Sequence, residues 1–241
     1  FHRLELDWNR LWKTSPRREI FTTFAWARAY VRTYGADGLR IAVGRRKGQI
    51  SAILPMRNGA GELRFIGTPH SDYCDLLCDG ETTFAELRQL IDTLAAGDRS
   101  WKRMRFDNLS ERSRLYQLLS KAEFRLGLPY SLRRGHQCPT VIAEDNPEHI
   151  FGDLLDKENP RRCEKRMATR GTLDCRHLES REQVQAQLDV FFDQHWIRRG
   201  LATGSGGMFA DERNRLFFRN LVEEFDPAGA LRFAVDRKSV G

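Results

Sequence analysis

Apolar residues recur at helical spacing at the start of the chain. A first amphipathic stripe covers residues 4–12 and ends at a Ser-Pro pair. A second stripe predicts a helix over residues 23–34, with Thr22 or Thr23 as its N-cap and Gly35 at its end. The pattern therefore predicts that the chain opens with two helices.

The apolar period then shortens to the alternation that is typical of strands. Residues 39–43, 49–55 and 62–66 are predicted strands, and short glycine-containing turns separate them. Strands joined in this way predict an antiparallel meander. A loop follows, with one short strand expected at residues 74–77.

Helices and strands alternate in the next segment. Thr83 and Glu86 form a capping-box pair, which predicts a helix through residue 94. The elements expected after it are a strand at residues 101–106, a helix at 110–121 and a strand at 140–143.

A second set of elements begins near residue 145. Asn159, followed by Pro160, is the expected N-cap of the helix at residues 161–170. Ser180 with Gln183 forms a capping box for the helix at residues 181–199, which Gly200 ends. The predicted helices are residues 147–155, 161–170, 181–199 and 211–225, the predicted strands are 173–178 and 230–236, and residues 204–207 are an expected linker.

Both sets place helices first and strands afterwards, which indicates a tandem repeat of one unit. We predict an α/β (α+β) fold with a mixed, mostly antiparallel sheet flanked by helices. The first unit covers residues 1–144, and the second, incomplete unit covers residues 145–241. The chain lacks an initial Met and ends within a predicted strand, so we expect a piece of a longer protein.

Composition narrows the class of protein. The chain has 241 residues, of which 40% are hydrophobic, and this excludes a collagen-like or wholly disordered chain. No run approaches the roughly 20 apolar residues of a membrane helix. The formal net charge is +7 and is diffuse, so charge alone does not predict a nucleic-acid groove. Arginine makes up most of the basic residues, which favours recognition of phosphate or carboxylate groups.

The cysteines indicate a reducing compartment, and we expect a cytoplasmic protein. Their number, five, is odd, and no secretory signal precedes them. Cys74 and Cys78 are four residues apart, but His70 is the only further ligand type close to them. We therefore predict small thiols and no metal site.

The first candidate site is the segment GTPHSDYCDLL at residues 67–77. It follows a predicted strand, where α/β folds place ligand contacts. Asp72 is a candidate base, Tyr73 a candidate donor to a developing oxyanion, and His70 with Ser71 a candidate substrate contact. The structural alternative is a turn in which Ser71 and Asp72 bind the backbone and Tyr73 packs.

The second candidate site is the basic helix within NPRRCEKRMATR. Arg162, Arg166 and Arg170 share one face, with Lys165 beside them. Such a stripe is suited to an anionic substrate, and a solvated helix face is the alternative.

The third candidate site is the pair His195-Trp196 on a predicted helix. His195 is a candidate catalytic base and Trp196 a candidate substrate contact. The alternative places both residues in the core, because His195 continues the apolar stripe of Phe191 and Phe192.

An ordered set of segments resembles the CelD-type branch of the GNAT acyltransferase superfamily, except that QHWIRRG departs from the pattern at the tryptophan. The segments are FTTFAWARAY (21–30), AILPM (52–56), LRFIGTPHSDYCDLL (63–77), NPRRCEKRMATRGTLDCRHL (159–178), QHWIRRG (194–200) and MFADERNRLFFRNLVEEF (208–225).

The resemblance implies a tandem GNAT fold similar to the Fem-type aminoacyltransferases. It implies direct transfer from acetyl-CoA or another acyl-CoA to an amine or hydroxyl, with a sugar, a small molecule or a cell-surface precursor as acceptor. Relatives near exopolysaccharide pathways suggest such an acceptor. The CoA-binding glycine loop of the superfamily is expected beyond Gly241. Two alternatives stay open: a Fem-like transferase using aminoacyl-tRNA, and a non-catalytic GNAT-like scaffold.

Overall fold

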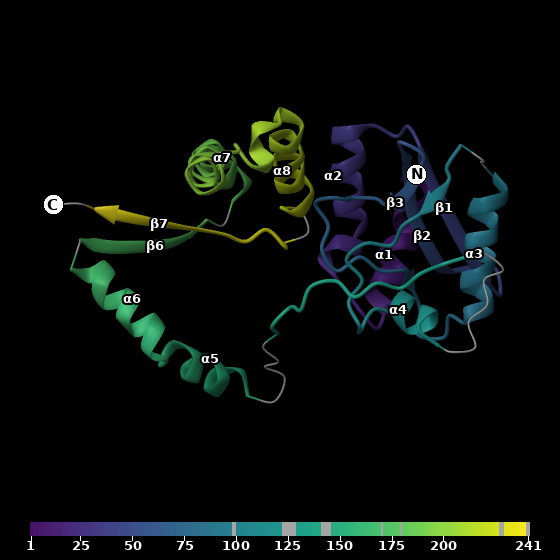
Figure 1. The fold of residues 1–241 in the computed structure, drawn as a ribbon, viewed down its shortest axis with the longest axis horizontal. Coiled ribbons are helices and arrows are strands. Elements are labelled where there is room, and N and C mark those ends of the chain that lie inside the picture. The colour runs from purple at the N-terminus through teal and green to yellow at the C-terminus, as the bar shows by residue number, and fades with distance from the viewer. Residues whose placement is uncertain are drawn as a thin grey trace.

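The computed structural model describes residues 1–97, 100–121, 129–140, 146–169, 171–178, 180–226 and 229–239. It has a mixed α/β architecture in which helices flank a curled mixed sheet (Figure 1). The fold class predicted from the sequence is confirmed.

Two helices open the chain as predicted: α1 (Glu5–Thr14) after the short 3-10 helix η1 (His2–Leu4), and α2 (Phe24–Tyr34) after η2 (Ile20–Thr22). The Thr23 hydroxyl accepts the N–H of Trp26 at 3.2 Å and so caps α2. Gly35 ends the helix at φ +82°, a conformation that favours glycine.

The predicted meander is present. It consists of β1 (Leu39–Arg46), β2 (Gln49–Gly59) and β3 (Glu62–Phe65). Antiparallel pairing aligns Val43 with Ile53 and Met56 with Phe65. Two short strands, β4 (Leu77–Cys78) and β5 (Arg103–Met104), pair with β2 and β3, so that five described strands form one sheet.

The strand expected at residues 74–77 is displaced to residues 77–78. The carboxylate of Asp75 accepts the backbone N–H groups of Leu76, Arg114 and Leu115, each at 2.8 Å. It therefore binds the first turn of α4 (Arg114–Leu119) instead of extending the sheet. This helix is shorter than expected because Ser113 caps it by accepting the N–H of Tyr116.

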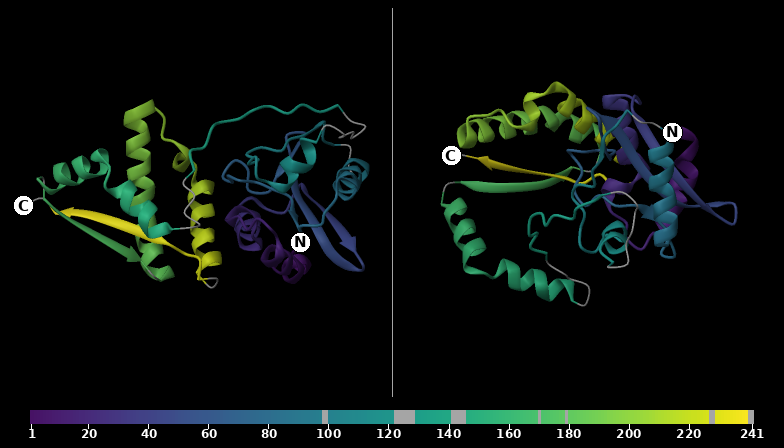
Figure 2. Two further views of the ribbon diagram at one scale, coloured as in Figure 1. Left: turned by 90° about the horizontal axis from the view of Figure 1, so that it is seen from below. Right: turned by 45° about the vertical axis from the view of Figure 1, so that its right-hand side comes forward.

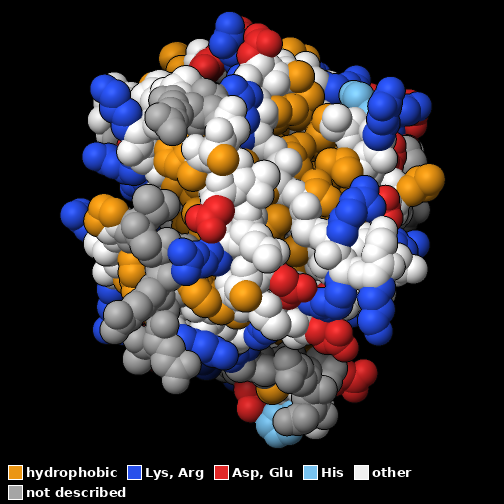
Figure 3. All heavy atoms as spheres, turned by 90° about the vertical axis from the view of Figure 1, so that its right-hand side faces the viewer, with side chains coloured by type: hydrophobic (Ala, Val, Ile, Leu, Met, Phe, Trp, Pro, Cys, Tyr) orange, Lys and Arg blue, Asp and Glu red, His pale blue; other side chains and the backbone are white. Residues whose placement is uncertain are grey.

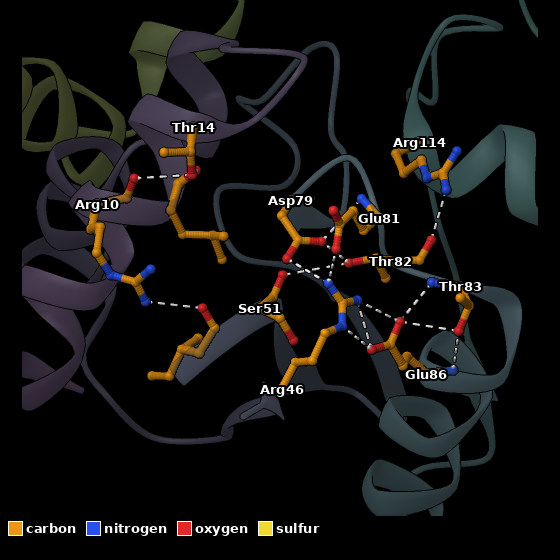
Figure 4. Close-up of polar contacts among 12 residues, drawn as sticks. Arg10, Thr14, Arg46, Ser51, Asp79, Glu81, Thr82, Thr83, Glu86 and Arg114 are labelled. Atoms are coloured by element: carbon orange, nitrogen blue, oxygen red, sulfur yellow. Dashed lines mark hydrogen bonds and ion pairs between the residues drawn. The ribbon is translucent and has the colours of Figure 1, made fainter. Parts of the chain in front are cut away.

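The helix α3 (Phe84–Gly97) begins at the predicted capping box: the backbone N–H of Thr83 donates to Glu86 at 2.7 Å, and the N–H of Glu86 donates to the Thr83 hydroxyl. Arg46 of β1 reaches Glu86, Asp79 and Glu81 (Figure 4). This cluster joins the sheet edge to the start of α3.

The second half contains α5 (Pro147–Leu155), α6 (Glu158–Ala168), β6 (Thr172–Leu178), α7 (Arg181–Thr203), η3 (Met208–Ala210), α8 (Glu212–Phe225) and β7 (Phe233–Ser239). Strands β6 and β7 form an antiparallel ribbon that pairs Leu178 with Phe233. Helices α7 and α8 lie on one side of this ribbon, and α5 and α6 curve away on the other (Figures 1 and 2).

Two helix boundaries predicted in this half were wrong. Lys157, not Asn159, is the N-cap of α6, and the Asn159 side chain accepts a hydrogen bond from Arg162 instead. Helix α7 continues through Gly200 and ends at Gly204, which has φ +70°. The capping box of Ser180 and Gln183 is confirmed.

Two clusters of buried side chains cover the faces of the larger sheet. One lies against α3 and α4. The other includes α1, α2 and, from the second half, Phe217, Leu221 and Phe225 of α8. The second half has a smaller cluster of its own around Phe192 and Phe209. The two predicted units therefore share one core through α8, while the boundary proposed between them lies outside the described residues.

The surface agrees with a diffuse basic charge. On the face shown in Figure 3, Lys and Arg side chains are scattered from the edge to the middle, with acidic side chains between them. None of the described helices has both the length and the apolar character that crossing a membrane requires.

Candidate functional site

The loop after β3, at residues 67–77, folds back on itself against α2. The backbone N–H groups of His70 and Ser71 both donate to the carbonyl oxygen of Gly67, at 2.7 and 3.0 Å. Gly67 has φ +95°, and a Cβ there would collide with the Ser71 hydroxyl and the Trp26 indole. Only glycine fits this turn without displacing its neighbours.

Ser71 holds this loop in place. Its side chain is buried, and its hydroxyl accepts a hydrogen bond from Trp26 Nε1 at 2.8 Å. The Asn108 amide donates to the Ser71 carbonyl at 2.8 Å. Ser71, predicted as a substrate contact, therefore positions the loop.

Asp72 and Tyr73 are the exposed side chains at the tip of the loop. Tyr73 is 43% exposed and has φ +49°, which is uncommon for a residue with a side chain. Its ring lies 6.4 Å from that of Phe21. These two candidate catalytic groups are accessible to a substrate from solvent.

His70 lies between α2 and α8. Its Nε2 is 2.9 Å from the Tyr34 hydroxyl, which donates to Asn214 Oδ1 at 2.7 Å. Since that hydroxyl proton is used, Nε2–H is the donor to Tyr34. The His70 ring stacks on Phe217 at 5.1 Å.

Burial sets the protonation states of His70 and Tyr34. It lowers the pKa of His70 below 6.5, so that the ring is neutral at neutral pH. It raises the pKa of Tyr34 to about 12. His70 Nδ1 is buried and, among the described residues, has no hydrogen-bond partner.

The buried cysteines are unsuited to nucleophilic chemistry. Burial raises the pKa of Cys74 and of Cys78 to about 12, so both stay protonated at neutral pH. In the part of the chain that the structure describes, no group of three or more His, Cys, Asp or Glu side chains is arranged to hold a metal.

His195 and Trp196 lie on α7 beside η3. The His195 ring meets Phe209 edge-on at 4.8 Å, and burial together with Arg199 and Arg198 lowers its pKa. Trp196 is 48% exposed rather than in the core. The expected linker at residues 204–207 packs here, because a Cβ on Gly206 would collide with the Trp196 indole and one on Gly207 would lie 3.1 Å from His195 Cε1.

The structure keeps this third candidate site apart from the loop after β3. Across the described ranges, no hydrogen bond or ring contact joins His195 to Asp72 or Tyr73. The nearest ring neighbour of His195 is Phe209, which belongs to the cluster of the second half.

The basic face of α6 is fully solvated. Arg162, Lys165 and Arg166 are exposed, and α6 has no buried residue. Arg162 donates to the neutral Asn159 side chain at 3.0 Å, so its charge is not neutralised there. Arg170, the fourth predicted member of this face, lies outside the described residues.

A half-open apolar pocket of about 250 Å³ lies where the two halves of the chain meet. Trp26 forms part of its wall and also donates to Ser71, so the pocket borders the loop at residues 67–77. Its lining residues are Ile20, Trp26, Leu188, Phe191, Phe218, Leu221, Val222, Phe225, Ala230, Leu231, Arg232 and Phe233.

The pattern of the sequence does not reveal the pocket or the bonds of Tyr34 and Asn214. Tyr34 is only the last residue of the helix predicted at residues 23–34, and no motif points to Asn214. Periodicity identifies which face of a helix is apolar, but it does not show which other helix meets that face. The one available signal was a tyrosine at the last position of an amphipathic helix.

Residues 157–237 match the model of a family described as acetyltransferase (GNAT) domain. The matched region runs from the start of α6 into β7 and contains most of the pocket wall. The mixed α/β arrangement agrees with a GNAT-like α+β fold. No curated protein and no solved structure matched the chain.

Proposed function

We propose that this protein is a GNAT-type acyltransferase that moves an acyl group from acyl-CoA to a nitrogen or oxygen of a small molecule, a sugar or a cell-surface precursor. The match of residues 157–237 to the GNAT acetyltransferase domain carries this proposal and supports acyl transfer in general. The CelD-type branch, the tandem arrangement and the acceptor class come from the resemblance of the sequence segments.

The chemistry of the described residues fits an acyl-CoA. Its phosphates would bind the exposed cations Arg162, Lys165 and Arg166 of α6. Its apolar acyl chain suits the apolar pocket. When bound, the cofactor supplies an activated thioester.

The chain's own groups then orient the acceptor and handle its proton. Tyr73 is an exposed hydroxyl donor suited to a developing oxyanion, and Asp72 is an exposed carboxylate suited to hold an amine or accept its proton. His195, with its lowered pKa, is the alternative base. His70 and Ser71 position the loop that carries the first two groups.

Calorimetric titration with acetyl-CoA tests the proposal. We expect binding, and we expect Arg162→Glu with Arg166→Glu to weaken it at least about tenfold, because each charge-assisted contact contributes roughly 1.5–3 kcal/mol. The matched control is Lys13→Glu with Arg18→Glu, which reverses two exposed cations of the first half and should leave affinity unchanged. Absence of acyl-CoA binding by the full-length protein, which includes the loop expected beyond Gly241, would overturn the proposal.

The exposed cations of α6 also support a second candidate, a Fem-like transferase that uses aminoacyl-tRNA. This candidate predicts that tRNA is retained and that retention falls steeply with salt. A protein that binds acyl-CoA but never turns it over would instead favour the non-catalytic scaffold.

A further inference from the structure

We infer that the apolar pocket between the two halves receives the tail of a medium-chain aliphatic acyl group, so that the donor class is a medium-chain acyl thioester. This inference rests on the proposed acyl transfer and specifies the group that is transferred. It concerns a pocket whose walls come from α2 and the preceding η2 in the first half, and from α7, α8, residues 230–232 and the start of β7 in the second.

The chemistry of the wall selects an apolar ligand. Eleven of the twelve lining residues are aliphatic or aromatic. The remaining one is Arg232, whose guanidinium donates to the carbonyl oxygens of Gly229 and Leu231 at 2.9 and 2.7 Å. A polar ligand would lose its water without finding partners here, which is costly, whereas an alkyl chain gains by leaving water.

The size of the pocket selects a chain longer than acetyl. A cavity of about 150 Å³ holds the six carbons of benzene, so a volume of about 250 Å³ has room for roughly ten carbons. An acetyl group would leave most of this apolar wall in contact with water. A chain of about eight to ten carbons covers it.

The position of the pocket connects it with the candidate catalytic loop. Trp26 contributes to the wall and holds Ser71 through its indole N–H. Phe21 bridges the two regions, since its ring lies 4.8 Å from that of Trp26 and 6.4 Å from that of Tyr73. An alkyl chain in the pocket therefore packs against the same indole that positions the loop with Asp72 and Tyr73.

The test measures affinity against chain length by calorimetry, with acyl-CoAs and with free fatty acids of two to fourteen carbons. We expect affinity to rise two- to fourfold for each added methylene up to about ten carbons and then to level off. Free fatty acids lack the nucleotide part, so they report on the pocket without the α6 contacts.

Two variants change the volume of the pocket in opposite directions. Ala230→Phe fills it at an exposed position and should reduce decanoate affinity at least tenfold, while Phe191→Ala enlarges it and should move the plateau to longer chains. Ala202→Phe makes the same change at an exposed position of α7 that does not line the pocket and should have no effect. Melting curves verify that each variant is folded.

The outcomes separate this inference from the proposed function. If all acyl-CoAs bind equally well and free fatty acids do not bind, the pocket inference is wrong and the acyltransferase proposal stands. If fatty acids bind with the expected dependence on length but no acyl-CoA binds more tightly than its free acid, the pocket inference stands and the CoA-dependent function fails. Equal losses in the Ala230→Phe and Ala202→Phe variants would also overturn the inference.

Discussion

In the first 121 residues, helices cover both faces of the larger sheet, whereas in residues 146–239 helices α7 and α8 cover one side of the β6–β7 ribbon and α6 has no buried residue. A ribbon of two strands is at best marginally stable alone in water. The second half therefore depends on α8, whose Phe217, Leu221 and Phe225 complete a core of the first half. One helix therefore connects the half that contains the larger sheet to the half that carries the GNAT match.

The contact between α2 and α8 is polar at several points along its length. Tyr34 bonds to Asn214, Thr33 bonds to Asn220, and Arg28 and Arg32 both bond to Glu224. The Glu224 side chain is only 6% exposed. Such directional contacts fix the register of the two helices, while the aromatic side chains provide most of the burial.

The largest effect should come from Phe217→Ala. This ring is fully buried and contacts Trp26, Tyr30 and His70 of the first half. We expect the free energy of unfolding to fall by about 3–5 kcal/mol, because the change removes burial and leaves a cavity. Urea unfolding followed by tryptophan fluorescence measures it.

The matched control is the neighbouring Leu216→Ala, since Leu216 is 46% exposed. It should cost about 0.5 kcal/mol or less. Equal losses for the two variants would mean that α8 does not join the halves through Phe217.

An intermediate effect is expected from Glu224→Gln, which removes the charged partner of Arg28 and Arg32. Both arginines remain partly solvated, so the expected loss is about 1–2 kcal/mol. Glu223→Gln is the control, because Glu223 is more exposed and pairs with Arg181 at the surface. If the midpoint of urea unfolding for Glu224→Gln is no lower than that of Glu223→Gln, the Glu224 carboxylate does not stabilise the contact between α2 and α8.

The smallest effect concerns pH and His70. Its pKa is lowered in the folded protein below the ordinary value of 6.5, mainly by burial, while Asn214 and Asp211 oppose the shift. As pH falls, His70 therefore takes up its proton in the unfolded chain before it does so in the folded protein. The contribution of neutral His70 to the free energy of unfolding is fully present above pH 6.5 and is lost as pH falls through the folded pKa.

Denaturation at several pH values between about 7 and 5 measures this loss. His70→Gln keeps a donor for Tyr34 but does not titrate there, so its stability should depend less on pH than that of the wild type. If the free energy of unfolding falls with pH equally steeply in the wild type and in His70→Gln, His70 is solvated in the folded protein.

The candidate site was predictable in part. The loop at residues 67–77 was identified from its polar residues after a strand, and the basic face of α6 was identified from its spacing. The structural role of Ser71 was not predictable, because it depends on a hydrogen bond from Trp26, which is 45 residues away in the chain. Trp196 is a candidate substrate contact with a core position as the alternative, and its 48% exposure excludes the core position.

The sequence by itself determined most of the described helices and strands, because capping residues, turns and apolar periods act over a few neighbouring residues. The strand predicted at residues 140–143 falls almost entirely outside the described residues. It did not determine the displacement of the strand expected at residues 74–77, since Asp75 is bound by backbone groups about 40 residues further along. Tertiary structure alone decided that α8 completes the core of the first half and that a pocket lies beside it. Both depend on which apolar faces meet, and that choice minimises exposed surface over the whole chain rather than within any one segment.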